Sequence, residues 1–286
     1  MSDWTGAEQS KGEWLKWRGK GLGSSDAPII MGVSPWKTPY QLWLEKTNIK
    51  PSTFKGNWAT RRGQELEPQI RIWYIGEHGI KMTPQNAEHH ENPVWRASAD
   101  GYNKTMNRLI EIKAPNIKDH QTAVEGNIPE KYFPQCQWLL MVFNAESLDY
   151  VSFNESHETS HAVVEIKPDL DYIRKLKEAA SDFWNHVERQ IPPPTDEQII
   201  DEQSDTAMAI AKYKALKEER DSIDTRIKQV VETIKEGVTS SKAICGDTKL
   251  NWVNRKGSID YAKIPELKKL DLEAYRKQPT KYFTIR

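Results

Sequence analysis

The spacing of the apolar residues changes along the chain in an order that constrains the fold. Helical spacing, with apolar residues three or four positions apart, occurs in pieces over residues 14–48 and again over 63–76. Three short segments with β-like composition follow, at residues 79–83, 94–99 and 108–113. The first half of the chain therefore predicts helices followed by a meander of three strands.

The next hundred residues return to helical spacing. A helix is expected over residues 129–144, two strands at 148–154 and 162–166, and an amphipathic helix over 169–190. This order of elements predicts an α/β fold, in which helices flank a mixed central sheet.

A proline-rich segment, Ile-Pro-Pro-Pro-Thr at residues 191–195, ends the last of these helices and marks a linker. Beyond it, apolar residues keep a spacing of three or four, with Arg220 at the missing heptad position. They are Tyr213, Leu216, Ile223, Ile227, Val230 and Ile234. This pattern predicts a coiled-coil-like helix or a helical hairpin. A small β-hairpin is expected around Gly246 and Asp247.

Composition excludes several classes of protein. Lys and Arg number 41, as do Asp and Glu, so any basic surface for nucleic acid must be local. Two cysteines, Cys136 and Cys245, are too few for a disulfide framework or a four-cysteine metal site. The sequence contains neither an apolar run of membrane-spanning length nor a signal-peptide core, so we expect a cytoplasmic protein.

Six tryptophans lie within the first sixty residues, and we expect them to be core anchors rather than base-stacking platforms. They are Trp4, Trp14, Trp17, Trp36, Trp43 and Trp58.

Two carboxylates and a lysine carry the clearest chemical signal. Asp100 is expected to end one strand beside Gly101, which would allow a tight turn, and Glu111 follows eleven residues later. Strand alternation places Glu111 and Lys113 on the same face of the next strand. Mg²⁺ is held by carboxylates, water and phosphate oxygens, and two such ions can promote phosphodiester displacement with a lysine orienting the attacking water. The alternative is a turn at Asp100 and a solvated charge pair on the strand.

Two glutamates and two glutamines elsewhere in the sequence could join these residues. Glu67, or less favourably Glu65, offers a third carboxylate on the helix before the meander. Gln135 and Gln137 lie on an otherwise apolar helix, where each needs a polar partner, either a metal or phosphate site or a sheet edge.

A loop rich in glycine and serine follows Arg18 and opens a helix near Asp26. Backbone N–H groups at a helix start, together with Ser24, Ser25 and a guanidinium, can bind phosphate. Simple N-capping by Ser25 or Asp26 is the alternative.

Together, in this order, these segments resemble the phage-type exonucleases of the YqaJ and lambda exonuclease family, within the PD-(D/E)XK nuclease superfamily. The motifs are W-x-x-x-R-x-x-x-[IL]-G-[SG]-S-[DE] at residues 14–26, G-x-E-L-E-P at 63–68, S-x-D-G at 98–101, E-I-K-x-P at 111–115 and Y-x-x-Q-x-Q at 132–137. The resemblance implies a restriction-endonuclease-like nuclease domain over residues 1–190. A C-terminal helical extension with a small hairpin would occupy 191–286.

The resemblance also implies roles for individual residues. Glu67, Asp100, Glu111 and the carbonyl of Ile112 resemble the ligands of two Mg²⁺ or Mn²⁺ ions, and Lys113 resembles the catalytic lysine.

In the same way, Gln135 resembles the glutamine that completes the active site. Arg18 and Ser25 resemble the residues that hold the 5′-phosphate of the digested strand.

Family members degrade one strand of linear duplex DNA from 5′ to 3′ and leave a 3′ single strand for an annealing protein in phage recombination. The resemblance to these proteins implies that this chain has the same activity and the same kind of partner, in a bacterial host cell. It also implies a homo-oligomer, such as a trimeric ring. The segment after Pro194 departs from the short lambda-type enzymes. A related endonuclease and a non-catalytic DNA-end-binding module remain as alternatives.

Overall fold

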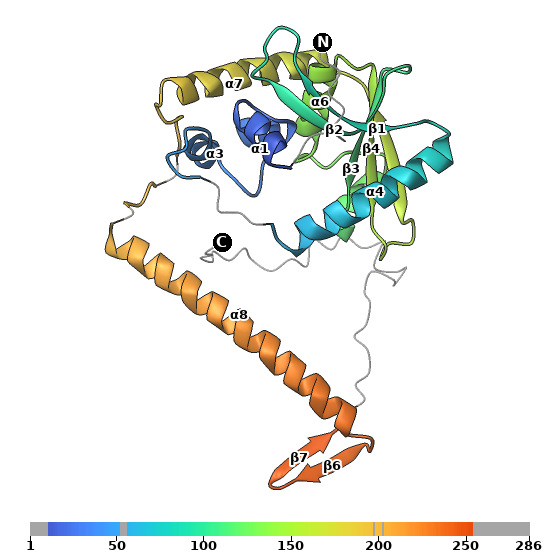
Figure 1. Cartoon of the computed structure of the whole chain (residues 1–286), viewed down its shortest axis with the longest axis vertical. Helices are drawn as coiled ribbons and strands as arrows, with labels where there is room; N and C mark the ends of the chain where they lie inside the picture. The colour runs from blue at the N-terminus through green and yellow to red at the C-terminus, as the bar shows by residue number, and fades with distance from the viewer. Residues whose placement is uncertain (1–10, 52–55, 197, 202, 254–286) are drawn as a thin grey trace, which may run out of the picture. The chain divides into compact units, whose positions relative to one another are not determined.

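The computed structural model describes residues 11–51, 56–196, 198–201 and 203–253, and the chain divides into two compact units, residues 1–198 and 199–286. The first unit contains a five-stranded sheet in the order β1-β2-β3-β4-β5 (Figure 1). Its strands are β1 (Thr83–Glu88), β2 (Arg96–Asn103), β3 (Arg108–Lys113), β4 (Ser147–Phe153) and β5 (His161–Ile166). Only β3 and β4 pair in parallel among these neighbours, so the sheet is mixed, as predicted.

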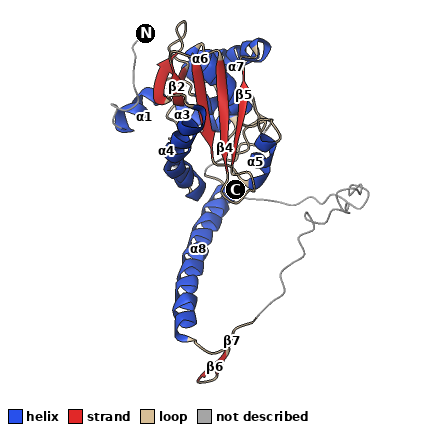
Figure 2. Ribbon diagram, turned by 90° about the vertical axis from the view of Figure 1, so that its right-hand side faces the viewer, coloured by secondary structure: helices blue, strands red, loops and turns tan. Residues whose placement is uncertain are grey.

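Helices cover both faces of this sheet (Figure 2). They are α1 (Lys11–Gly19), α2 (Ala27–Ile30), α3 (Pro39–Lys46), α4 (Trp58–His78), α5 (Ile117–Val124), α6 (Phe133–Phe143) and α7 (Leu170–Glu188), with a 3₁₀ turn, η1 (Ser24–Asp26), before α2. The main core joins α6 and α7 to one face, where Trp138 and Leu176 are fully buried. On the other face, Ile70 and Tyr74 of α4 pack in a second cluster. The predicted α/β fold with a flanked mixed sheet is confirmed.

The central strand β3 presents different residues to the two faces. Ile110 and Ile112 belong to the cluster formed with α4, whereas Leu109 belongs to the core formed with α6. Glu111 lies on the α6 side and is only 2% exposed. Because a central strand is covered on both sides, this carboxylate is buried among elements that sequence spacing alone does not bring together.

Three sequence expectations for this region are wrong. The first strand begins at Thr83 instead of spanning 79–83, because Gly79, with φ of 66°, ends α4 in the left-handed conformation. Helix α5 was not expected from the sequence; its start is capped by Asn116, whose side chain accepts a hydrogen bond from the backbone N–H of Asp119. Finally, β2 continues past Asp100 to Asn103.

Gly101 is therefore a strand residue and not part of a tight turn. It pairs with Ile110, and a Cβ atom there would lie 2.7 Å from Cγ1 of Ile110 and 2.8 Å from Cβ of Met82. The glycine is required because neighbouring side chains pack directly over the strand.

The expectation that these tryptophans are core anchors holds for one of the five that the structure describes. Trp43 is buried, but Trp36 and Trp58 are 66% and 69% exposed. Trp14 and Trp17 are half-buried, and Trp4 lies outside the described residues.

The second unit contains a 33-residue helix, α8 (Asp205–Gly237), and an antiparallel hairpin of β6 (Lys242–Cys245) and β7 (Thr248–Asn251). Ser204 caps α8 by accepting a hydrogen bond from the backbone N–H of Ala207. The helical extension with a hairpin is thus confirmed, and its apolar spacing lies on one continuous helix.

Among the described residues, none of the helices combines the length and apolar character that crossing a membrane requires.

Candidate active site

Six of the predicted site residues line one cavity of about 180 Å³ in the first unit. Arg18 and Ser25 contribute from α1 and η1, and β2, β3 and α6 supply the others, which are Asp100, Glu111, Lys113 and Gln135. Residues separated by more than a hundred positions in the sequence thus meet in a single small space.

The acidic and basic groups of this cavity contact one another directly. Lys113 forms an ion pair with Glu111 through Nζ and Oε1, and its ammonium lies 5.6 Å from the centre of the Tyr132 ring. Asp100 accepts a hydrogen bond of 2.7 Å from the backbone N–H of Ile112. This bond holds the carboxylate of β2 against β3, in the position that the sequence spacing predicts.

Burial and mutual repulsion raise the pKa values of the carboxyls. Burial raises the pKa of Glu111, and the charges of Asp100 and Glu67 add to this effect. The pKa of Asp100 is also raised, first by burial, although Lys113 and the N–H of Ile112 oppose the change. Burial would lower the pKa of Lys113, but Glu111 and Asp100 outweigh it and raise the pKa. The site therefore concentrates negative charge that a cation would relieve.

Glu67 lies near this group without lining the cavity. Its carboxylate is paired with Arg71, one turn further along α4. Burial and then the charge of Asp100 raise the pKa of Glu67, which places the two carboxylates within electrostatic range. Glu65, the less favoured alternative, is exposed.

The two glutamines of α6 have different partners. Gln135 donates a hydrogen bond of 2.6 Å from Nε2 to Oε1 of Glu111. Gln137 is buried; its Nε2 donates to the carbonyl of Lys167, and its Oε1 accepts from the N–H of Asp169 at the start of α7. Gln135 therefore belongs to the site, and Gln137 positions a helix.

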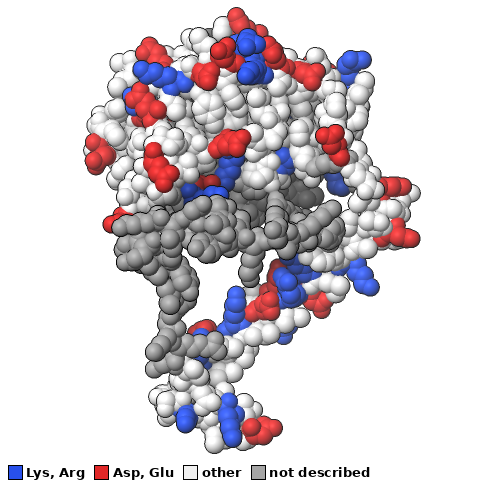
Figure 3. Space-filling model, turned by 180° about the vertical axis from the view of Figure 1, so that it is seen from behind, with Lys and Arg blue, Asp and Glu red and all other residues white. Residues whose placement is uncertain are grey.

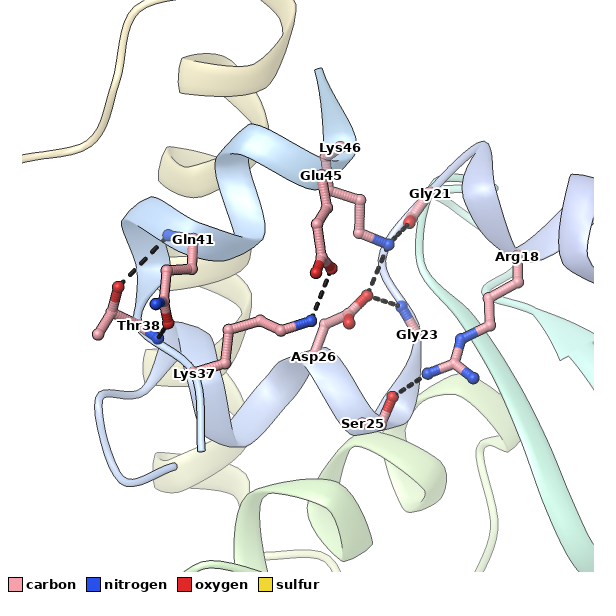
Figure 4. A network of polar contacts seen from close by, with 10 residues as sticks. All are labelled: Arg18, Gly21, Gly23, Ser25, Asp26, Lys37, Thr38, Gln41, Glu45 and Lys46. Atoms are coloured by element: carbon pink, nitrogen blue, oxygen red, sulfur yellow. Dashed lines mark hydrogen bonds and ion pairs between the residues drawn. The ribbon is translucent and has the colours of Figure 1, made fainter. Parts of the chain in front are cut away.

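The other side of the cavity is built by the loop after α1. Figure 4 shows the guanidinium of Arg18 reaching across this loop to donate a hydrogen bond to the hydroxyl of Ser25. Gly23, Ser24 and Ser25 all line the cavity, so small residues bring the backbone close to it. Ser25 is thus a partner of Arg18 and does not act as a simple helix cap.

Asp26 supports this loop from behind (Figure 4). Its Oδ2 accepts a 2.9 Å hydrogen bond from the N–H of Gly23 and lies 2.7 Å from Nζ of Lys46. Lys46 also donates to the carbonyl of Gly21. Burial would raise the pKa of Asp26, but Lys46, Arg18 and the Gly23 N–H together lower it. This buried pair ties α3 to the loop that carries Ser25.

The lining residues that were not predicted as site residues include Trp14, Trp17 and Arg96. The guanidinium of Arg18 lies 5.1 Å from the Trp14 ring centre, and Nε1 of Trp14 donates to the hydroxyl of Ser98. The four-residue step from Trp14 to Arg18 places both on one face of α1, which was the available sequence signal.

The basic side chains that line this cavity, beside its two carboxylates, are a local feature of the surface. The chain carries no net charge, and Figure 3 shows basic and acidic side chains interspersed over the face that it displays. Arg18, Arg96 and Lys113 nevertheless converge on one cavity. This agrees with the expectation that any basic surface must be local.

Two of the predicted metal ligands, Glu67 and Glu111, are paired with basic side chains. Within the described part of the chain, no group of three or more His, Cys, Asp and Glu side chains is arranged to hold a metal ion. Arg71 forms an ion pair with Glu67, and Lys113 forms an ion pair with Oε1 of Glu111. However, Oε2 of Glu111 is buried without a hydrogen-bond partner among those residues. A buried, unpartnered carboxylate oxygen beside Asp100 fits a hard divalent cation.

Comparisons with known proteins extend over the same region. Residues 13–146 match the family model of the YqaJ-like viral recombinase domain. A curated relative, the uncharacterized protein YqaJ of Bacillus subtilis strain 168, is 30% identical over 181 residues. The match covers 63% of this chain and 57% of that protein, so the chain spans little more than half the length of this relative.

Two solved structures of LHK-Exo, an alkaline exonuclease from Laribacter hongkongensis, are similar in fold. One is 26% identical with a TM-score of 0.56 and covers 63% of this chain and 94% of that chain. The other, a complex with dAMP, is 25% identical with a TM-score of 0.56 and covers 64% and 94%.

Proposed function

Residues 13–146 match the family model of the YqaJ-like viral recombinase domain, and from this premise we propose that the chain belongs to that family and is a metal-dependent deoxyribonuclease. In finer terms, it is a 5′-to-3′ exonuclease that digests one strand of linear double-stranded DNA and leaves a 3′ single strand. One observation carries the proposal: Arg18 and Ser25 share a single small cavity with Asp100, Glu111 and Lys113. The alkaline exonuclease LHK-Exo has a similar fold, which supports a nuclease activity.

Asp100 and Glu111 would hold Mg²⁺ or Mn²⁺, with Glu67 and the carbonyl of Ile112 completing the ligands of two ions. Such ions, when bound, stabilise the attacking and leaving oxygens of a phosphodiester displacement. The unpartnered Oε2 of Glu111 and the raised pKa values of the carboxyls support this assignment.

The protein's own groups then have separate tasks. Lys113 orients the attacking water and neutralises charge that develops on the scissile phosphate. Gln135 fixes the carboxylate of Glu111 through its amide. Arg18, with Ser25 and the backbone of the loop, binds a terminal 5′-phosphate as a charge-assisted contact. Because the cavity is small, a terminal phosphate held there brings an adjacent phosphodiester to the carboxylates.

This arrangement favours the exonuclease over the two alternatives. An endonuclease that cuts within a strand has no use for a site that binds a terminal phosphate. A non-catalytic end-binding module would have no use for the buried carboxylate of Glu111, since burying a carboxylate is costly and Lys113 only offsets that cost.

The product would be a 3′ single strand, which suits a single-strand annealing protein as partner in phage-type recombination. A homo-oligomer, such as a trimeric ring, would keep the enzyme on its DNA. Both partners are part of the proposal.

The decisive experiment uses three substrates with Mg²⁺: linear duplex with a 5′-phosphate, the same duplex with a 5′-hydroxyl, and covalently closed circular DNA. We expect label to be released from the 5′ strand of the phosphorylated duplex while circles stay intact. Nicked or linearised circles would establish the endonuclease instead. If no substrate is cleaved in Mg²⁺ or Mn²⁺, the chain is an end-binding module.

A further inference from the structure

Helix α8 carries a long apolar stripe that no other described residue of the second unit covers. None of its 33 residues is buried. The exposed apolar side chains include Met208, Tyr213, Leu216, Ile223, Ile227, Val230, Val231 and Ile234. An amphipathic helix of this length normally packs its apolar face against a partner.

The stripe has the heptad spacing of a coiled coil. Tyr213, Arg220, Ile227 and Ile234 occupy a positions, and Leu216, Ile223 and Val230 occupy d positions. The flanking e and g positions carry charges that set partner choice and orientation. Position e holds Lys217 and Asp224, and position g holds Lys212, Glu219 and Arg226.

A parallel, in-register pair of α8 helices would be repulsive. In that arrangement each g residue faces the e residue five positions further along the other helix. Lys212 would face Lys217 of the second copy, and Glu219 would face Asp224 of the second copy. Arg220 would also meet its own counterpart in the seam.

The antiparallel register in which the two copies of α8 overlap over almost their whole length has complementary charges. With Leu216 packed against Ile227 of the second copy, e faces e and g faces g across the seam. Lys217 then lies opposite Asp224, and Glu219 lies opposite Arg226, each twice by symmetry. Ile210 and Val231, the remaining e residues, form an apolar pair.

Neighbouring antiparallel registers lose this match. A shift of one heptad in one direction places Glu219 opposite Glu219 and Lys217 opposite Lys217. The opposite shift places Arg226 opposite Arg226 and Asp224 opposite Asp224. Like charges in these positions disfavour both registers.

We propose that α8 is a self-association helix that docks antiparallel on α8 of a second copy, in the register that joins Leu216 to Ile227. Lys217, Glu219 and Arg226 form no ion pair with other described residues, so they are available to the second copy. Arg220 forms ion pairs with Asp221 at 2.6 Å and, more loosely, with Asp224 at 4.0 Å on its own helix, which neutralises the one charge in the seam. No residue of α8 is among those that line the cavity of the first unit, so the proposal holds whether or not the chain cleaves DNA.

The first test measures association of the full-length chain by sedimentation. Lys217→Glu places two carboxylates opposite each other twice, and we expect an association constant about tenfold lower, from two reversed pairs of a few tenths to one kcal/mol each. The double variant Lys217→Glu/Asp224→Lys restores opposite charges and should return to within about twofold of the wild type. Lys214→Glu, the same change at a b position outside the seam, should have no effect.

In a parallel pair the same change acts in the opposite sense. Lys217→Glu would then face Lys212, and association would become stronger. Stronger association, or a wild-type chain that stays monomeric at all concentrations, would overturn the proposal.

The second test fixes the register by cross-linking. All variants carry Cys245→Ser, because Cys245 is exposed whereas Cys136 is buried. In the antiparallel register Leu216→Cys/Ile227→Cys should give a disulfide-linked dimer on oxidation. Leu216→Cys alone should not, because its two copies lie about 16 Å apart along the helix.

The outcomes are distinct. A dimer cross-linked by Leu216→Cys alone would show a parallel pair, which contradicts the proposal. Failure of the double variant to cross-link would show that something other than a second α8, such as another segment of the same chain, covers the stripe.

Discussion

Gln135 donates a 2.6 Å hydrogen bond to Oε1 of Glu111, and the other carboxylate oxygen, Oε2, is left buried without a partner in the described structure. The glutamine, from α6, and the carboxylate, from the central strand β3, meet only because α6 packs on that face of the sheet. Oε1 is held by an amide and by the ammonium of Lys113, while Oε2 remains available to a cation.

Replacing Lys113 with alanine should reduce DNA cleavage by about 10²–10⁴-fold, the usual contribution of one acid–base or electrostatic group. Binding of duplex DNA, measured by fluorescence anisotropy with Ca²⁺ in place of Mg²⁺, should persist. Lys175→Ala, at an exposed position of α7, serves as the matched control. Wild-type cleavage by a verified Lys113→Ala preparation would remove the lysine from the mechanism.

Divalent cations should stabilise the folded protein. At a Mg²⁺ or Mn²⁺ concentration of about 100 times Kd, binding contributes about 2.7 kcal/mol, which corresponds to a rise in Tm of about 5 °C or more. Glu111→Gln and Asp100→Asn should each lose most of this rise, because they remove a negative ligand from the buried cluster. Differential scanning fluorimetry with and without EDTA measures it. An equal rise in both variants would place the cation elsewhere.

Arg18→Ala should slow digestion of 5′-phosphorylated ends more than digestion of 5′-hydroxyl ends. A charge-assisted contact with phosphate contributes about 1.5–3 kcal/mol. The preference of the enzyme for 5′-phosphorylated over 5′-hydroxyl ends should therefore fall about 10- to 100-fold. Initial rates on two duplexes that differ only in the 5′ group provide the measurement. If both rates fall by the same factor, Arg18 supports the fold of the loop and does not recognise the phosphate.

Gly101→Ala should destabilise the first unit by about 1–3 kcal/mol, because the added Cβ would overlap Ile110 and Met82. Gly76→Ala, on α4, has nothing within 4 Å of the added atom and should stabilise by about 0.5–1 kcal/mol. Urea denaturation compares the two. Loss of stability in both variants would contradict the packing argument.

Asp26 should contribute to acid sensitivity. Since its pKa is lowered in the folded state, its contribution to stability is present above its unfolded pKa of about 3.9 and is lost as pH falls through the folded pKa. Asp26→Asn should cost about 3–5 kcal/mol at pH 7, because Lys46 is left buried without its carboxylate. Urea denaturation between pH 6 and pH 3 should show a smaller loss in the variant than in the wild type. Equal losses would exclude the linkage to Asp26.

The sequence by itself was sufficient to predict much of the fold. The composition and spacing of residues 108–113 predicted strand β3. Alternation also predicted that Glu111 and Lys113 lie on the same face of this strand, because alternation depends only on local backbone geometry. The proline run predicted where the long α7 ends, since proline cannot continue a helix. The separation of the two strands put Asp100 near Glu111, because an antiparallel pair brings such positions together.

Tertiary structure decided what local spacing cannot encode. Gln135 and Gln137 are the same residue type on the same helix, so the sequence does not distinguish their partners. The packing of α6 decides that Gln135 hydrogen-bonds to Glu111 and that Gln137 hydrogen-bonds to the start of α7. Packing likewise decided that Gly101 lies within a strand. It also brought Arg18 and Ser25 into the same cavity as Asp100, although no local rule relates residues so far apart. Distances across a core depend on how whole elements pack, and that information is distributed over the entire chain.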